Sequence, residues 1–143
     1  MNLEKLVAIS GRSGLFRMAS NRSNGLIVED FDNGKRFFVS ARLHQFTPLA
    51  SISIYTETEE DTVELKVVFK RMLKDLETNP PLDIKSEGNE LRAYFEKIMP
   101  EHDRDRVLIS DIKKLIKWFS FLQERNLLNF DETEQATEEV TEG

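Results

Sequence analysis

Residues 15–40 read LFRMASNRSNGLIVEDFDNGKRFFVS, and this stretch decides how the first part of the chain folds. Three short runs rich in β-forming residues, at 15–20, 26–30 and 36–40, are separated by polar segments that contain Asn24-Gly25 and Asn33-Gly34. Asn-Gly pairs favour tight hairpins because both residues adopt a positive φ at little cost. The stretch therefore predicts a meander of short antiparallel strands.

A fourth run, at 51–56, extends the pattern, and apolar residues fall on both faces of these runs. Such a distribution is expected when a small sheet curls on itself, so we predict a compact SH3-like β-barrel of four to five short strands. Residues 43–49 are expected to form the turn before its last strand. Before the meander, we expect a helical turn capped by Asn2, then a bend at Gly11 and Gly14.

After Glu57 the apolar residues change to a helical period. They predict a three-helix α region: an amphipathic helix at 63–76, a second helix that ends near Pro100, and a third that starts at a Ser110 cap with Asp111 in its first turn. The expected buried positions are Leu65, Val68, Phe69, Met72, Leu73, Leu76, Leu91, Tyr94, Phe95, Ile98, Ile112, Leu115, Ile116, Phe119 and Leu122.

The fold class is thus α+β, and we divide the chain into four segments. These are a barrel domain at 1–57, an amphipathic helix and linker at 58–86, a small helical domain at 87–128 and a disordered acidic tail at 129–143. The tail prediction follows from charge: residues 131–143 hold six acidic and no basic side chains, which accounts for the whole net charge of −6.

The composition excludes several classes of site. The 143 residues include no cysteine, so no disulfide framework, thiolate nucleophile or Cys-ligated metal is possible. No apolar run is long enough to span a membrane, and a cytoplasmic protein is expected. Residues 110–113 match S-x-x-K without its partner motifs, and neither a nucleophile elbow nor a phosphate loop is complete. We therefore expect no enzyme activity and no cofactor.

His102 lies in the most polar run of the body, PEHDRDR at 100–106, where a His beside carboxylates can bind metal or move protons. The chain has one other histidine, His44, in a predicted turn, so a multi-His site is not expected. We interpret the run as a structural loop between helices, and treat an enzymatic role of His102 as a third hypothesis.

Two basic surfaces are the candidate binding sites. The residues 1–56 hold seven basic and four acidic side chains, and basic groups beside aromatic residues can hold a phosphate backbone while stacking bases. Trp118 flanks the third helix's apolar stripe, where it either widens the buried face or anchors a partner. The candidate residues are Arg12, Arg17, Arg22, Lys35, Arg36 and Arg42 in the barrel, and Lys113, Lys114, Lys117 and Trp118 on the third helix.

The segments AISGRSGLF (8–16), NGLIVE (24–29) and IYTE (54–57), with LRAYF (91–95), DRDRV (103–107) and SDIKK (110–114), resemble a family of Bacteroidetes-type bacterial proteins described as a domain of unknown function. The resemblance covers roughly residues 1–125. It implies a short N-terminal barrel domain, a small helical domain and a bacterial cytoplasmic setting, without a reaction or ligand.

Two hypotheses follow for function. The first is a non-catalytic binding or adaptor protein that contacts another protein, or a second copy of itself, through the barrel or the helices. The alternative is a nucleic-acid-associated protein that binds RNA or DNA through the mildly basic barrel, with the acidic tail competing for the same surface.

Overall fold

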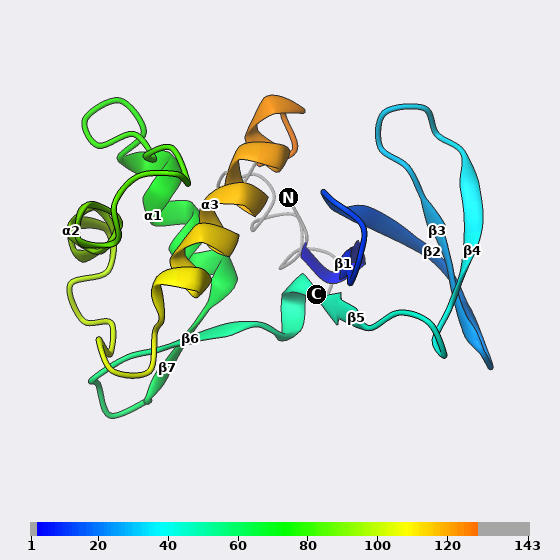
Figure 1. Cartoon of the computed structure of the whole chain (residues 1–143), viewed down its shortest axis with the longest axis horizontal. Coiled ribbons are helices and arrows are strands. Elements are labelled where there is room, and N and C mark those ends of the chain that lie inside the picture. The colour runs from blue at the N-terminus through cyan, green and yellow to red at the C-terminus, as the bar shows by residue number, and fades with distance from the viewer. Residues whose placement is uncertain (1–2, 129–143) are drawn as a thin grey trace, which may run out of the picture.

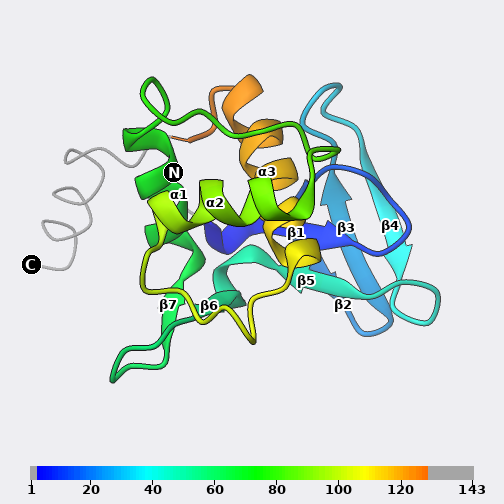
Figure 2. The same ribbon diagram turned by 60° about the vertical axis from the view of Figure 1, so that its left-hand side comes forward.

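The computed structural model describes residues 3–128, so the predicted disordered tail at 129–143 lies outside the described residues. Within them the α+β order is confirmed: an antiparallel sheet precedes three helices. The helices gather on one side of the molecule and the β2–β4 meander lies on the other, with β1 and β5 between them (Figures 1 and 2).

The main sheet has five strands in the order β4-β3-β2-β1-β5, each antiparallel to its neighbours. β4 and β5 are its two edge strands, and within residues 3–128 they do not pair with each other, so the five strands form an open sheet. Its strands are β1 (Leu6–Ile9), β2 (Phe16–Arg22), β3 (Gly25–Glu29), β4 (Arg36–Ser40) and β5 (Phe46–Pro48).

The meander is confirmed, but Asn24 and Gly25 do not have the positive φ predicted for its first hairpin, and Gly25 is instead needed for close packing against β4. A Cβ atom at this position would lie 2.1 Å from the Val39 carbonyl oxygen and 2.8 Å from the Phe38 ring. The absence of a side chain therefore lets β4 and the Phe38 ring approach the start of β3.

Two predictions about the ends of the sheet are wrong. The expected helical turn is limited to a 3-10 turn at Leu3–Lys5, after which Leu6–Ile9 form β1. The expected turn at 43–49 contains β5, which pairs with β1 and ends at Pro48. A proline is tolerated there because β5 is an edge strand.

β1 is a strand because its two faces are buried against different layers. Val7 and Ile9 face the core inside the curved sheet, whereas Leu6 and Ala8 pack against the helices. Alternation along a strand sends neighbouring side chains to opposite faces, so a four-residue apolar run joins the two cores. The sheet and the helices are therefore held together through β1.

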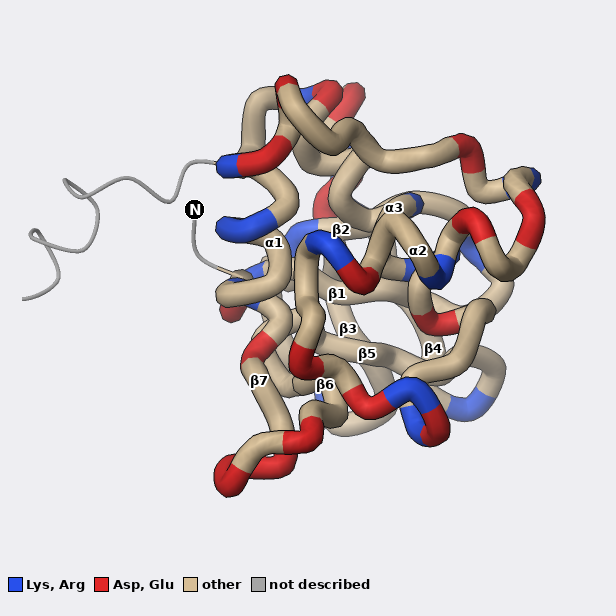
Figure 3. The backbone as a smooth tube through the Cα atoms, turned by 90° about the vertical axis from the view of Figure 1, so that its left-hand side faces the viewer, with Lys and Arg blue, Asp and Glu red and all other residues tan. Residues whose placement is uncertain are grey.

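The predicted fourth strand, at 51–56, lies outside the main sheet. A 3-10 turn, η2 (Leu49–Ser51), leads into β6 (Ser53–Tyr55), which pairs with β7 (Thr62–Glu64) in a separate two-stranded sheet. The turn between them contains Glu57, Glu59, Glu60 and Asp61, an acidic cluster that Figure 3 shows at one end of the molecule. This hairpin spans position 57, the predicted boundary between the first two segments.

The helices are α1 (Leu65–Lys74), α2 (Gly88–Ile98) and α3 (Ile109–Glu124). Their predicted apolar stripes are confirmed, because 13 of the 15 expected positions are buried and the other two, Leu73 and Leu76, pack against the same core. The cap prediction for α3 is wrong: the helix starts before Ser110, and the Asp111 carboxylate accepts the Leu108 backbone N–H at 2.9 Å. The longer acidic side chain reaches back to this N–H from inside the first turn.

Candidate functional site

An open groove of about 850 Å³ lies between the β1–β2 loop, α3 and the segment at 82–84. Its volume falls within the ~300–1,000 Å³ of common ligand pockets. The apolar lining comes from Leu82 and Ile84 on one side, Phe31 on another, and Trp118 and Phe121 from α3. The groove therefore combines an apolar surface with access from solvent.

Close packing at Gly14 holds the two walls of the groove together. Gly14 has φ +80°, a left-handed conformation, and a Cβ atom there would lie 2.7 Å from the Phe121 ring. Glycine meets both requirements, since it adopts positive φ readily and leaves room for the ring. The predicted bend is confirmed, and its function is to place the β1–β2 loop against α3.

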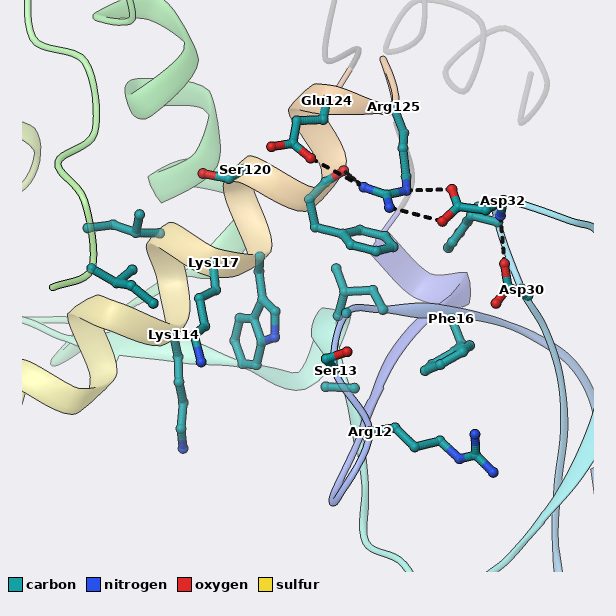
Figure 4. A pocket seen from close by; sticks show the side chains of 18 of the residues that line it. Arg12, Ser13, Phe16, Asp30, Asp32, Lys114, Lys117, Ser120, Glu124 and Arg125 are labelled. Carbon is teal, nitrogen blue, oxygen red and sulfur yellow. Dashed lines mark hydrogen bonds and ion pairs between the residues drawn. The ribbon is translucent and has the colours of Figure 1, made fainter.

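One end of the groove is closed by an ion pair. The Arg125 guanidinium donates to both Asp32 carboxylate oxygens, at 2.9 and 3.0 Å, and lies 3.7 Å from the centre of the Phe121 ring (Figure 4). This hydrogen bonding holds the pKa of Asp32 below its usual value and raises the pKa of Arg125. The pair joins the β3–β4 loop to the end of α3.

The carboxylates that line the groove are all engaged within the protein. Asp32 pairs with Arg125, and Glu124 lies 3.6 Å from the same guanidinium. Asp30 accepts the backbone N–H of Asp32 at 2.7 Å, and Asp83 accepts that of Lys85 at 2.8 Å. These acidic groups therefore have hydrogen-bond partners before any ligand arrives.

Two lysines at the other end have no such partner. Lys114 and Lys117 are exposed, and neither forms an ion pair with another residue in the described range 3–128. Both project from α3 away from the Arg125–Asp32 pair (Figure 4). This end of the groove therefore carries uncompensated positive charge.

Trp118 stands between the groove and a smaller hollow of about 250 Å³, and it lines both together with Lys114. The smaller hollow, which we call the side hollow, is lined by Ile52, Tyr55 and Val107 among others. Trp118 is half-buried against the helical core. Trp118 therefore widens the buried face, which is one of the two predictions for it, and it also lines two hollows.

The structure brings four of the ten candidate residues to the groove: Arg12, Lys114, Lys117 and Trp118. Arg12 lies on the wall opposite α3, and its guanidinium is 4.8 Å from the centre of the Phe37 ring. The remaining candidates, which do not line the groove, are Arg17, Arg22, Lys35, Arg36, Arg42 and Lys113.

The arginines of the N-terminal sheet region are dispersed, and some already have partners. Arg36 pairs with Glu29 at 3.2 Å, and Arg17 lies 5.5 Å from the centre of the Phe31 ring. Arg22 donates to Ser20 at 3.4 Å. The basic groups predicted from the barrel sequence therefore lie along several strands and loops and do not line a common cavity.

His102 is 1% exposed, and both of its ring nitrogens have partners. Nε2 lies 3.2 Å from Arg92 Nη1, and Nδ1 lies 2.6 Å from the Met99 carbonyl oxygen. A guanidinium only donates, so Nε2 accepts and the Nδ1–H donates to Met99. The ring also packs edge-on against Phe95, with 4.8 Å between centres. These contacts give His102 a structural role in the loop before α3.

Other chemical features of the described range are few. Residues 3–128 contain no group of three or more His, Asp or Glu side chains placed to hold a metal ion. None of the helices described is long and apolar enough to cross a membrane. The groove lining includes the Ser13 and Ser120 hydroxyls but no histidine.

Comparisons with known proteins place the chain in a family. Residues 3–49 match the model of a domain of unknown function, DUF5606, and residues 52–122 match a second one, DUF6852. A solution NMR structure of a Bacteroides vulgatus protein, a structural genomics target, is 35% identical with a TM-score of 0.72, and the alignment covers 90% of this chain and 91% of that one. The chain belongs to this bacterial family.

The two domain matches and the similar Bacteroides vulgatus protein confirm the resemblance predicted from the sequence. The two family models meet at residues 49–52, which is where η2 joins the main sheet to the β6–β7 hairpin. No curated protein matches the chain. The function must therefore be argued from the groove itself.

Proposed function

We propose that this protein is a non-catalytic adaptor of the bacterial cytoplasm, which binds a segment of a partner protein in the groove beside α3. The observation that carries the proposal is the groove's lining: a half-buried tryptophan and other apolar side chains, flanked by lysines without ion-pair partners. Tryptophan is among the residues that contribute most to protein interfaces, since a large apolar surface is combined with a polar N–H.

The groove's dimensions favour a short extended segment. Lys114 and Arg125, which lie at opposite ends, are 11 positions apart on α3 and its cap. At ~1.5 Å per residue this is about 16 Å, a distance that about five residues of an extended chain span at ~3.3 Å each. The SH3-like barrel is part of the same proposal: a curved sheet with its own core, formed around Val7 and Val28, supports the β1–β2 loop wall.

Binding of nucleic acid by the barrel has less support. The barrel arginines do not gather on one cavity, and an acidic cluster lies at the β6–β7 turn (Figure 3). Phosphate binding depends on clustered cations, because affinity comes from releasing counterions along the backbone. We keep this alternative as an outcome of the experiments below.

The test is affinity capture from the native cytoplasm with quantitative mass spectrometry and three baits. Ser120→Tyr fills the groove from the C-terminal half of α3, whereas Gln123→Tyr adds the same side chain at an exposed position of the same helix outside the groove. We expect a protein partner that wild type and Gln123→Tyr recover equally and Ser120→Tyr loses. A partner recovered equally by all three baits, or no stoichiometric partner, would contradict the proposal.

A further inference from the structure

We infer that the groove selects a partner segment in which an apolar side chain is flanked by carboxylates: the apolar side chain enters the side hollow, and the carboxylates bind Lys114 and Lys117. This inference rests on the proposed adaptor function, and it deepens that function by naming the chemistry of the partner.

The first argument is charge. A ligand that enters the groove meets carboxylates already engaged by Arg125 and by backbone N–H groups, but meets lysines that have no anionic partner in the described range. The side hollow repeats this pattern. In its lining, the Asp111 carboxylate accepts the Leu108 N–H, and Arg106 forms ion pairs with Asp61 and Asp103. Among the charged residues of this lining, Lys114 is therefore the one without a partner in the described range.

The second argument is size and lining. The side hollow, about 250 Å³, is smaller than common ligand pockets, and its apolar lining includes Ile52, Tyr55, Val107, Leu115 and Trp118. This space suits one large apolar side chain better than a cofactor. Burial of such a side chain contributes roughly 1.5–3 kcal/mol, which makes it the anchor of the segment.

The third argument is the position of Lys114. Lys114 lines both the groove and the side hollow, and Lys117 is three positions farther along α3. Residues at i and i+3 are neighbours on a helix surface. A segment whose anchor enters the side hollow therefore places its adjacent residues beside both lysines.

Trp118 is the single tryptophan of the chain, so its fluorescence reports this site directly. We would titrate the full chain with a synthetic peptide in which a central phenylalanine has two glutamates on each side. One matched peptide replaces the glutamates with glutamine, and another replaces the phenylalanine with alanine. Excitation at about 295 nm selects indole, which these peptides lack.

We expect the acidic peptide to bind at least tenfold more tightly than either matched peptide. The double variant Lys114→Gln/Lys117→Gln should remove the advantage of glutamate over glutamine, because the charges that select it are gone. Lys113→Gln is the matched control, since Lys113 is on the same helix but lines neither hollow. It should leave the advantage unchanged, and 0.5 M salt should reduce it in wild type.

Three results would overturn the inference. The first is equal binding of the acidic and glutamine peptides, or no change in Trp118 fluorescence with either. The second is an equal loss in Lys113→Gln and the double variant. The third is tighter binding of a ten-residue oligothymidylate through the same lysines, which would assign the surface to nucleic acid. In the first two cases a partner lost specifically by Ser120→Tyr would still support the adaptor function.

Discussion

Replacing Gly14 with alanine tests how the groove is built. The substitution places an L-residue at φ +80° and sets its Cβ 2.7 Å from the Phe121 ring. The left-handed conformation costs about 1–2 kcal/mol, and displacing a packed ring adds about 1–3 kcal/mol. We expect a loss of about 3 kcal/mol in the free energy of unfolding, or roughly 10 °C in Tm for a chain of this size.

Gly34→Ala is the matched control. Gly34 has φ +72°, and nothing lies within 4 Å of the added Cβ, so this variant carries the backbone cost without the steric one. We expect a loss of about 1 kcal/mol, because alanine also reduces the entropy of the unfolded chain. The difference in the free energy of unfolding between Gly14→Ala and Gly34→Ala therefore measures the contact between the β1–β2 loop and α3.

The assay is urea unfolding followed by Trp118 fluorescence and by far-UV circular dichroism, with Gly14→Ala repeated in a Phe121→Leu background. Leucine removes the outer ring atoms, so the steric part of the cost should fall in the double variant. If Gly14→Ala unfolds at the same urea concentration as Gly34→Ala, or if Phe121→Leu brings no relief, the loop is not held by this contact and the reasoning is wrong.

Three further predictions concern stability and charge. His102→Ala should lower the free energy of unfolding by about 2–4 kcal/mol in thermal melts, because it removes a buried ring and leaves Arg92 without one of its acceptors. Hydrogen bonds from Arg106 lower the pKa of Asp61 and Asp103 in the folded state. The stability that these two carboxylates contribute is therefore fully present above their unfolded pKa near 4 and is lost as the pH falls through the lower folded pKa. In acid titrations of the free energy of unfolding, Arg106→Gln should flatten this part of the profile. Removing residues 129–143, which hold six acidic side chains, should tighten binding of the acidic peptide at low salt and leave it unchanged at 0.5 M salt.

The parts of the fold with a clear period could be predicted from the sequence. Asn24-Gly25 marks the β2–β3 hairpin, and the stripe from Leu65 to Met72 gives the buried face of α1. β1 could not be predicted, because a four-residue apolar run buried on both faces looks the same in a strand and in a helical turn. β5 is three residues long and ends in Pro48, which is typical of a turn until its pairing with β1 is known.

Part of the groove lining can be predicted from the sequence. Lys114, Lys117 and Trp118 stand out because they are close together in the sequence and flank an apolar stripe. The opposite wall was missed, since Ser13, Phe31 and Ile84 come from distant segments and share no local pattern. The pair that closes the groove joins Asp32 to Arg125, 93 positions apart, and no sequence period connects them.

The central claim, that the groove beside α3 binds a partner protein, is tested most directly by site-specific photo-crosslinking in living cells. A photoreactive amino acid at position 13 lies in the groove and keeps both lysines in place, and the same amino acid at position 113 lies on α3 outside the groove. We predict one protein crosslinked from 13 and absent from 113, at a peptide in which carboxylates flank an apolar side chain. Identical crosslinks from both positions, or none from 13, would contradict the claim.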